Sequence, residues 1–65
     1  MSVFLLSIGN ELLDGRVLNT NAQWFGEQLR VAGIPVAEVR SVSDEVSCIR
    51  SALRAAARYP LVVVT

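Results

Sequence analysis

The feature that most constrains the fold is a short run, Val3-Phe4-Leu5-Leu6-Ser7-Ile8, which is apolar at nearly every position and ends at Gly9. The run is too short for a typical helix, and its apolar residues do not alternate with polar ones as in a strand with one solvated face. Such runs are typical of central parallel strands, which are buried on both faces. The run therefore predicts an α/β protein in which helices cover both sides of a parallel sheet.

Two further stretches predict strands. Leu61–Val64 is again apolar throughout, which favours a second interior strand. Val36–Val42 places Glu38, Arg40 and Ser41 among its valines, and this mixture is typical of a strand at the edge of a sheet.

The segment after the first strand has the periodicity of a helix. Thr20 and Gln23 have the spacing of a capping box and predict its start. Gly33, followed by Ile34 and Pro35, predicts its end. The residues expected to face the sheet are Ala22, Phe25, Leu29 and Ala32, with Trp24 and Val31 widening that face.

A second helix is predicted between Val36–Val42 and Leu61–Val64. The sequence Ser43-Asp44-Glu45 predicts a capped start with acidic groups in the first turn, and Asp44 is interpreted as a cap. Tyr59-Pro60 predicts the end. The expected inner stripe is Val46, Ile49, Leu53 and Ala56.

The resulting order, β-α-β-α-β, predicts a three-layer α/β/α fold with a parallel sheet. With the two apolar strands inside, the spatial order is 2-1-3, and right-handed crossovers place the helices on opposite faces. Strand 2 is thus added on one side of strand 1 and strand 3 on the other, so the order of addition reverses between strands 1 and 3. Ligands of such sheets bind in the crevice at this switch point, where Gly9 and Thr65 end their strands.

The candidate ligand-binding residues are Gly9, Asn10, Glu11, Gly15, Asn19 and Asn21, and no catalytic residue is assigned. They lie in or just after a predicted long loop, 9–18, with a brief extended piece around Arg16-Val17. Gly9 would let backbone amides approach a phosphate or would only form a tight turn. Glu11 would orient a ribose, help to hold a metal, or accept backbone N–H groups of its own loop. Asn19 and Asn21 flank a helix amino terminus, which favours an anion.

Composition excludes several classes of function. Six basic residues balance six acidic ones, so we expect no nucleic-acid or membrane partner. One cysteine, Cys48, and no histidine exclude a disulfide framework and a Cys/His metal site, and we assign no metal within these residues. The start lacks a secretory signal. We expect a cytoplasmic protein.

The sequence Ile8-Gly9-Asn10-Glu11-Leu12-Leu13-Asp14-Gly15, followed by Asn19-Thr20-Asn21, resembles the start of the competence-damage-inducible protein A family. The resemblance covers essentially the whole chain and implies the amino-terminal part of a molybdopterin-binding-like domain. It implies hydrolysis of ADP-ribose-type pyrophosphates with a divalent metal in the intact protein, in many members beside a nicotinamide-mononucleotide deamidase domain. The alternatives are a molybdopterin-binding domain of molybdenum cofactor biosynthesis and a non-enzymatic structural fragment.

In that family a Gly-Gly-x-Gly-Pro-Thr loop and two aspartates follow the third strand, whereas this sequence stops at Thr65. We therefore expect residues 1–65 to be a fragment of the domain that has no activity alone. The intact protein is expected to bind a nucleotide or pterin and to form a homo-oligomer.

Overall fold

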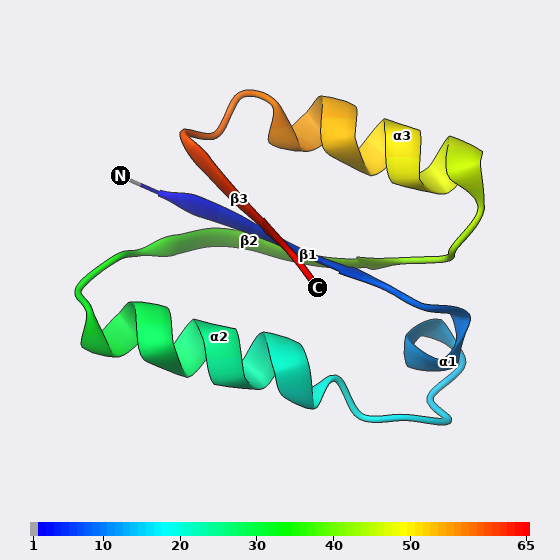
Figure 1. Cartoon of the computed structure of the whole chain (residues 1–65), viewed down its shortest axis with the longest axis horizontal. Helices are drawn as coiled ribbons and strands as arrows, with labels where there is room; N and C mark the ends of the chain where they lie inside the picture. Colours follow the sequence, from blue (N-terminus) through cyan, green and yellow to red (C-terminus); the bar gives the residue numbers. More distant parts are fainter. Residues whose placement is uncertain (1) are drawn as a thin grey trace.

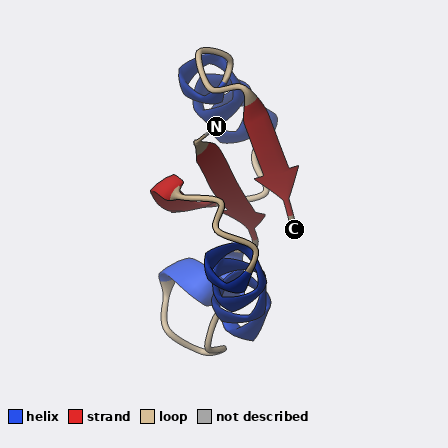
Figure 2. Cartoon of the chain, turned by 90° about the vertical axis from the view of Figure 1, so that its left-hand side faces the viewer, coloured by secondary structure: helices blue, strands red, loops and turns tan. Residues whose placement is uncertain are grey.

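The computed structural model describes residues 2–65, in which a parallel sheet lies between two long helices (Figures 1 and 2). The elements in chain order are β1 (Val3–Ile8), α1 (Asn10–Leu13), α2 (Thr20–Val31), β2 (Val36–Val42), α3 (Val46–Ala56) and β3 (Leu61–Val64). The strand order is β2-β1-β3, as the sequence predicts. None of the helices in residues 2–65 has the length and apolar character that a membrane crossing requires.

β1 is the centre of the core. It pairs in parallel with β2 on one side and with β3 on the other, so that Leu6 lies between Arg40 and Val64. Phe4 and Leu6 are fully buried and pack against α3. Because side chains alternate along a strand, Val3, Leu5 and Ser7 point to the opposite face, which α2 covers (Figure 1).

The end of α2 confirms the sequence prediction, but its start differs. Gly33 has a φ of +77°, and its N–H donates to the carbonyl of Arg30. The N–H of Ile34 donates to the carbonyl of Leu29, which completes a Schellman motif. At the start, Asn19 is the cap, because its side chain accepts the N–H of Ala22; the prediction that Thr20 caps the helix is wrong.

The inner face of α2 is narrower than predicted. Ala22 is buried, and Phe25 and Leu29 are half-buried, as expected. Trp24 and Val31, which were expected to widen this face, are 58% and 70% exposed. At 3.6 residues per turn, both lie about 180–200° around the helix from Ala22. They are therefore on the solvent side, and Ala32 is exposed as well.

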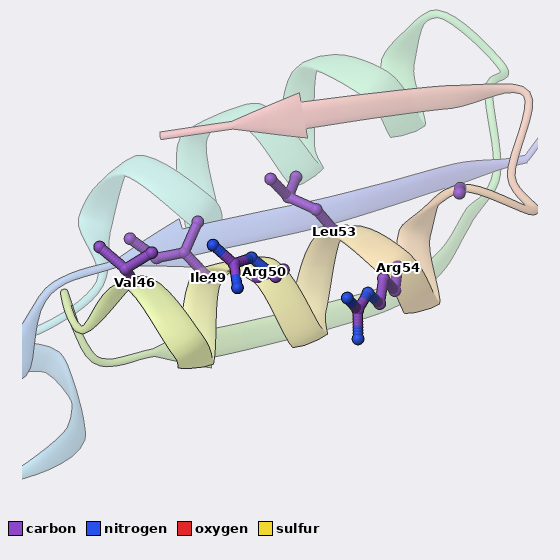
Figure 3. A pocket seen from close by; sticks show the side chains of 6 residues that line it. Val46, Ile49, Arg50, Leu53 and Arg54 are labelled. Atoms are coloured by element: carbon purple, nitrogen blue, oxygen red, sulfur yellow. The ribbon is translucent and has the colours of Figure 1, made fainter.

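α3 is rotated relative to the predicted stripe. Ala52 and Ala56 face the sheet and are 1% exposed, whereas Val46 and Leu53 are 67% and 45% exposed. Only Ala56 of the predicted set is buried, with Ile49 half-buried. Two small side chains let the helix lie close to Phe4 and Leu6. The larger residues border a groove along the flank of α3 (Figure 3).

Candidate functional site

The connection from β1 to α2 was expected to be a loop throughout, but it contains a one-turn helix, α1. The N–H of Leu12 donates to the carbonyl of Gly9, and that of Asp14 donates to the carbonyl of Asn10. Gly15, with a φ of +79°, then turns the chain back. No strand forms around Arg16-Val17. The loop is thus a compact unit held by its own hydrogen bonds.

A cavity of about 150 Å³ opens where the carboxyl ends of β1 and β3 meet the start of α2. This is the crevice that the strand order predicts. The polar residues lining it are Ser7, Glu11, Asn19, Thr20, Asn21 and Thr65. They come from separate parts of the chain, so the fold assembles them.

The two strands that flank the cavity are tied together at its edge. The N–H of Ile8 donates to the carbonyl of Thr65 at 3.0 Å, and the N–H of Thr65 donates to the carbonyl of Leu6 at 2.9 Å. These bonds continue the β1–β3 ladder past Val64. The position of Thr65 in the cavity wall is therefore set by the backbone of β1.

Of the six predicted ligand-binding residues, the structure brings Glu11, Asn19 and Asn21 together in this cavity. Gly9 lies beside them and is buried. Its φ of 165° is open to any residue, but a Cβ there would lie 2.7 Å from Glu11 Oε1. Gly9 therefore provides the space into which the Glu11 carboxylate folds.

Gly15 and Asn10 are not among the residues that line the cavity. Gly15 occupies the turn after α1. Asn10 faces Asp44: its Nδ2 donates to Asp44 Oδ1 at 3.0 Å, and the Asp44 N–H donates to Asn10 Oδ1 at 3.3 Å. Asp44 is therefore not the helix cap that the sequence suggested, and the N-cap of α3, Glu45, makes no side-chain capping bond.

Replacing Asn10 with alanine is expected to lower the free energy of unfolding by about 0.5–1.5 kcal/mol, the usual net contribution of a hydrogen bond. Asp44→Ala should cost a similar amount, and the double variant should cost little more than either single one, because both remove the same pair of bonds. Urea denaturation of the four proteins measures the coupling. Additive losses would contradict the pairing, and Glu27→Ala combined with Asn10→Ala serves as the uncoupled control, because Glu27 lies on α2 and pairs with Arg30.

Ser7 is a cavity residue that the sequence analysis did not single out. Its side chain is 1% exposed, and its hydroxyl has no hydrogen-bond partner among residues 2–65. The sequence does contain a signal, since Ser7 is the one polar residue in the apolar run of β1. An isolated hydroxyl on a buried strand costs free energy unless something hydrogen-bonds to it.

The charge of the cavity is set by one carboxylate. Glu11 is the only ionisable side chain among the residues that line it, and no lysine or arginine is among them. The part of the chain that the structure describes contains no group of three or more His, Cys, Asp or Glu side chains that could hold a metal ion. The remaining polar groups are hydroxyls and amides, which both donate and accept hydrogen bonds.

Comparisons with known proteins agree with this architecture. Residues 4–65 match the family model described as "Probable molybdopterin binding domain". A crystal structure of CinA from Thermoplasma acidophilum, described as having unknown function, superposes with a TM-score of 0.91 at 36% identity. It matches 97% of this chain, which covers 38% of that one.

Two sequence relatives likewise match nearly the whole of this chain, which covers only a small part of each. A protein of Aeropyrum pernix is 43% identical over 95% of this chain and 24% of its own length. A CinA-like protein of Frankia casuarinae is 39% identical over 100% of this chain and 15% of its own length. The chain thus spans less than a quarter of each of these relatives. It belongs to the family of probable molybdopterin binding domains, in the form that CinA-like proteins carry.

Proposed function

We propose that this chain provides the nucleotide-binding part of an enzyme that hydrolyses ADP-ribose-type pyrophosphates. The observation that carries the proposal is the polar cavity at the carboxyl ends of β1 and β3, beside the amino terminus of α2. Parallel α/β sheets bind nucleotides at this place. A carboxylate near such a site hydrogen-bonds ribose hydroxyls, and the presence of Glu11 in the lining of the cavity supports this role.

The start of α2 supports binding of the phosphate groups of the same ligand. The first N–H groups of a helix have no carbonyl partner within the helix, and the helix dipole favours negative charge there. Asn19 Oδ1 accepts the N–H of Ala22. Thr20 and Asn21 occupy the first turn and line the cavity.

A divalent metal is part of the proposal for the intact protein, but residues 2–65 do not fit one by themselves. Glu11 is a single carboxylate, and no three candidate ligands gather in the described residues. A Mg²⁺ site uses several oxygen ligands around the ion. The proposal therefore assigns binding to these residues and no metal-dependent step.

Molybdopterin is the second candidate ligand, and the matching family model favours it by its description. A pterin also carries amide-like donors and acceptors that the asparagine side chains could pair with. Calorimetry with both ligands separates the candidates. Tighter binding of molybdopterin than of ADP-ribose would reverse our order.

The hydrolase proposal predicts that Glu11→Gln lowers kcat/KM for ADP-ribose about 10- to 100-fold, because a hydrogen bond to a charged group contributes about 1.5–3 kcal/mol. The assay uses the protein at its full natural length, with Mg²⁺. Glu27→Gln is the matched control, since Glu27 pairs with Arg30 on the exposed side of α2. Absence of turnover in the wild type would refute the activity, and an unchanged Glu11→Gln variant would remove Glu11 from ligand binding.

A further inference from the structure

We propose that β2 pairs edge to edge with β2 of a second copy of this chain, antiparallel and in one register centred on Val39. In the sheet of residues 2–65, β2 pairs with β1 on one side and with no strand on the other side, which we call the outer edge. The two long helices lie over the two faces of the sheet and not beside β2 (Figure 2). The backbone N–H and C=O groups of the outer edge can therefore bind a further strand.

The composition of β2 does not oppose such pairing. Edge strands are commonly protected by proline, by very short length, or by charges of one sign such as lysine. β2 has seven residues and contains neither proline nor lysine. Its register with β1 shifts near its start, and residues 38–42 then pair with β1 without a break. The central part of β2 is thus a regular strand that a second copy can match.

The sequence of β2 is self-complementary. It reads Val36-Ala37-Glu38-Val39-Arg40-Ser41-Val42, with opposite charges on the two sides of the central valine, then a small residue and then a valine on each side. A two-fold axis that passes through Val39 perpendicular to the sheet makes the two copies antiparallel and brings the same surface of each copy together. Each Glu38 then lies opposite Arg40 of the other copy, and Val39 lies opposite Val39.

The charges select this register over its neighbours. Opposite charges directly across an antiparallel pair stabilise it, and like charges destabilise it. A register centred on Glu38 would place the two Glu38 carboxylates opposite each other, and one centred on Arg40 would do the same with the two guanidinium groups. The register centred on Val39 instead contains two pairs of opposite charge.

The geometry of the two charged side chains agrees with this arrangement. Arg40 Nε donates to Glu38 Oε2 at 2.8 Å, and the guanidinium carbon lies 5.3 Å from the centre of the Phe4 ring. Both side chains are therefore held on the face of the sheet that α3 covers. Their ion pair joins Arg40 Nε and Nη2 to Glu38 Oε2, so Arg40 Nη1 and Glu38 Oε1 lie outside it. In the dimer these atoms meet the other copy, and the four groups form a ring of alternating charge.

The other face of β2 offers an apolar contact. Side chains alternate along a strand, so Val39 points away from Glu38 and Arg40. Val39 is 57% exposed and borders a groove that Ile34, Pro35 and Val36 also line. Val39 of a second copy would cover this exposed surface, and burial of apolar surface favours association.

The dimer would leave the candidate site accessible. β2 and β3 lie on opposite sides of β1, and the polar cavity lies where β1 and β3 end. The inference therefore does not depend on which ligand the cavity binds.

The test is disulfide formation by Val39→Cys in the protein at its full natural length. Residues directly opposite in an antiparallel pair have Cα atoms about 4.5–5.5 Å apart, which is within the range that a disulfide spans. Mild oxidation should link two chains through position 39, identified by mass spectrometry of the linked peptides. Val31→Cys is the matched control, since Val31 is a 70% exposed valine on the solvent side of α2. It should form linked dimers about tenfold more slowly or not at all.

Charge reversal in the Val39→Cys protein tests the register. Glu38→Arg and Arg40→Glu should each slow the linking about tenfold, because both cross-strand pairs then contain like charges. An equimolar mixture of the two variants should recover the linking, because every pair between the two different chains then joins opposite charges. Mixing cannot restore the ion pair within one strand, so recovery identifies the contact between copies. The double variant Glu38→Arg/Arg40→Glu should link as fast as the parent.

Several results would overturn the inference. These are equal linking at positions 39 and 31, linking that neither reversal slows, and a double variant as slow as the single ones. If a single variant does not fold, the parent protein provides the test of charge, because added salt should slow its linking and an unchanged rate would count against the pairing. Absence of a link at position 39 would also overturn it. Protection of the Val39→Cys thiol from a soluble reagent would then show that another segment of the intact protein covers the outer edge.

Discussion

Replacing Leu6 with alanine is expected to lower the free energy of unfolding by about 2–5 kcal/mol, the range for truncation of a buried leucine. Leu6 is 0% exposed and packs in one cluster with Phe4, Ala52 and Ala56. It lies on the central strand, so the cavity left behind would be bounded by backbone that both neighbouring strands hold in place. The surroundings can therefore collapse only slightly. Chemical denaturation measures the change.

Leu18→Ala is the matched control, because Leu18 is 82% exposed. Truncating it removes almost no buried surface, and we expect a change within about 0.5 kcal/mol, as for other surface substitutions. Similar losses in the two variants would show that β1 is not the centre of the core.

Replacing Ala52 with leucine is expected to lower the free energy of unfolding by about 1–3 kcal/mol through overpacking. Ala52 is 1% exposed and belongs to the cluster that includes Phe4 and Leu6. The added carbon atoms have no free volume on this face, so α3 would have to move away from the sheet. The same substitution at an exposed position should change the free energy of unfolding by no more than about 0.5 kcal/mol, as for other surface substitutions.

Ala57→Leu provides that comparison, because Ala57 is the exposed C-cap that directly follows α3 and adjoins the groove on its flank. Denaturation midpoints of the two variants, measured together, test the rotation of α3. Destabilisation by Ala57→Leu with tolerance of Ala52→Leu would mean that the helix presents the face that the sequence pattern suggested, with Leu53 inward.

The strands and their order could be predicted because the relevant signals are short and local. Val3–Ile8 is apolar at almost every position, and this alone assigned it to the interior, where the structure places it. Leu61–Val64 is apolar throughout as well, but among residues 2–65 it is an edge strand, with Leu61 and Val64 37% and 51% exposed. The mixed composition of Val36–Val42 assigned it to the edge. The end of α2 was predictable for the same reason, since Gly33 and Pro35 are local stop signals.

The buried faces and the N-caps of the helices were predicted less well, because more than one residue type at neighbouring positions suits each of these positions. Asn19 and Thr20 can both cap a helix, and the choice depends on which side chain can reach the N–H of Ala22. In α3 the pattern favoured the largest apolar residues, but close contact with Phe4 and Leu6 selected the smallest. The periodicity of apolar residues along a helix does not show how closely that helix will pack against a sheet.

The sequence by itself determined the parallel α/β order, the interior position of β1 and the crevice beyond it, because apolar runs, turn residues and crossover handedness act locally or through general rules. Only the tertiary structure decided the composition of the site. It directed Asn10 to Asp44, thirty-four positions along the chain, and placed the buried Ser7 hydroxyl in the same cavity as Glu11, Asn19 and Asn21. These contacts depend on how loops from separate strands meet in space. A linear pattern of residues does not show which of them will lie close together.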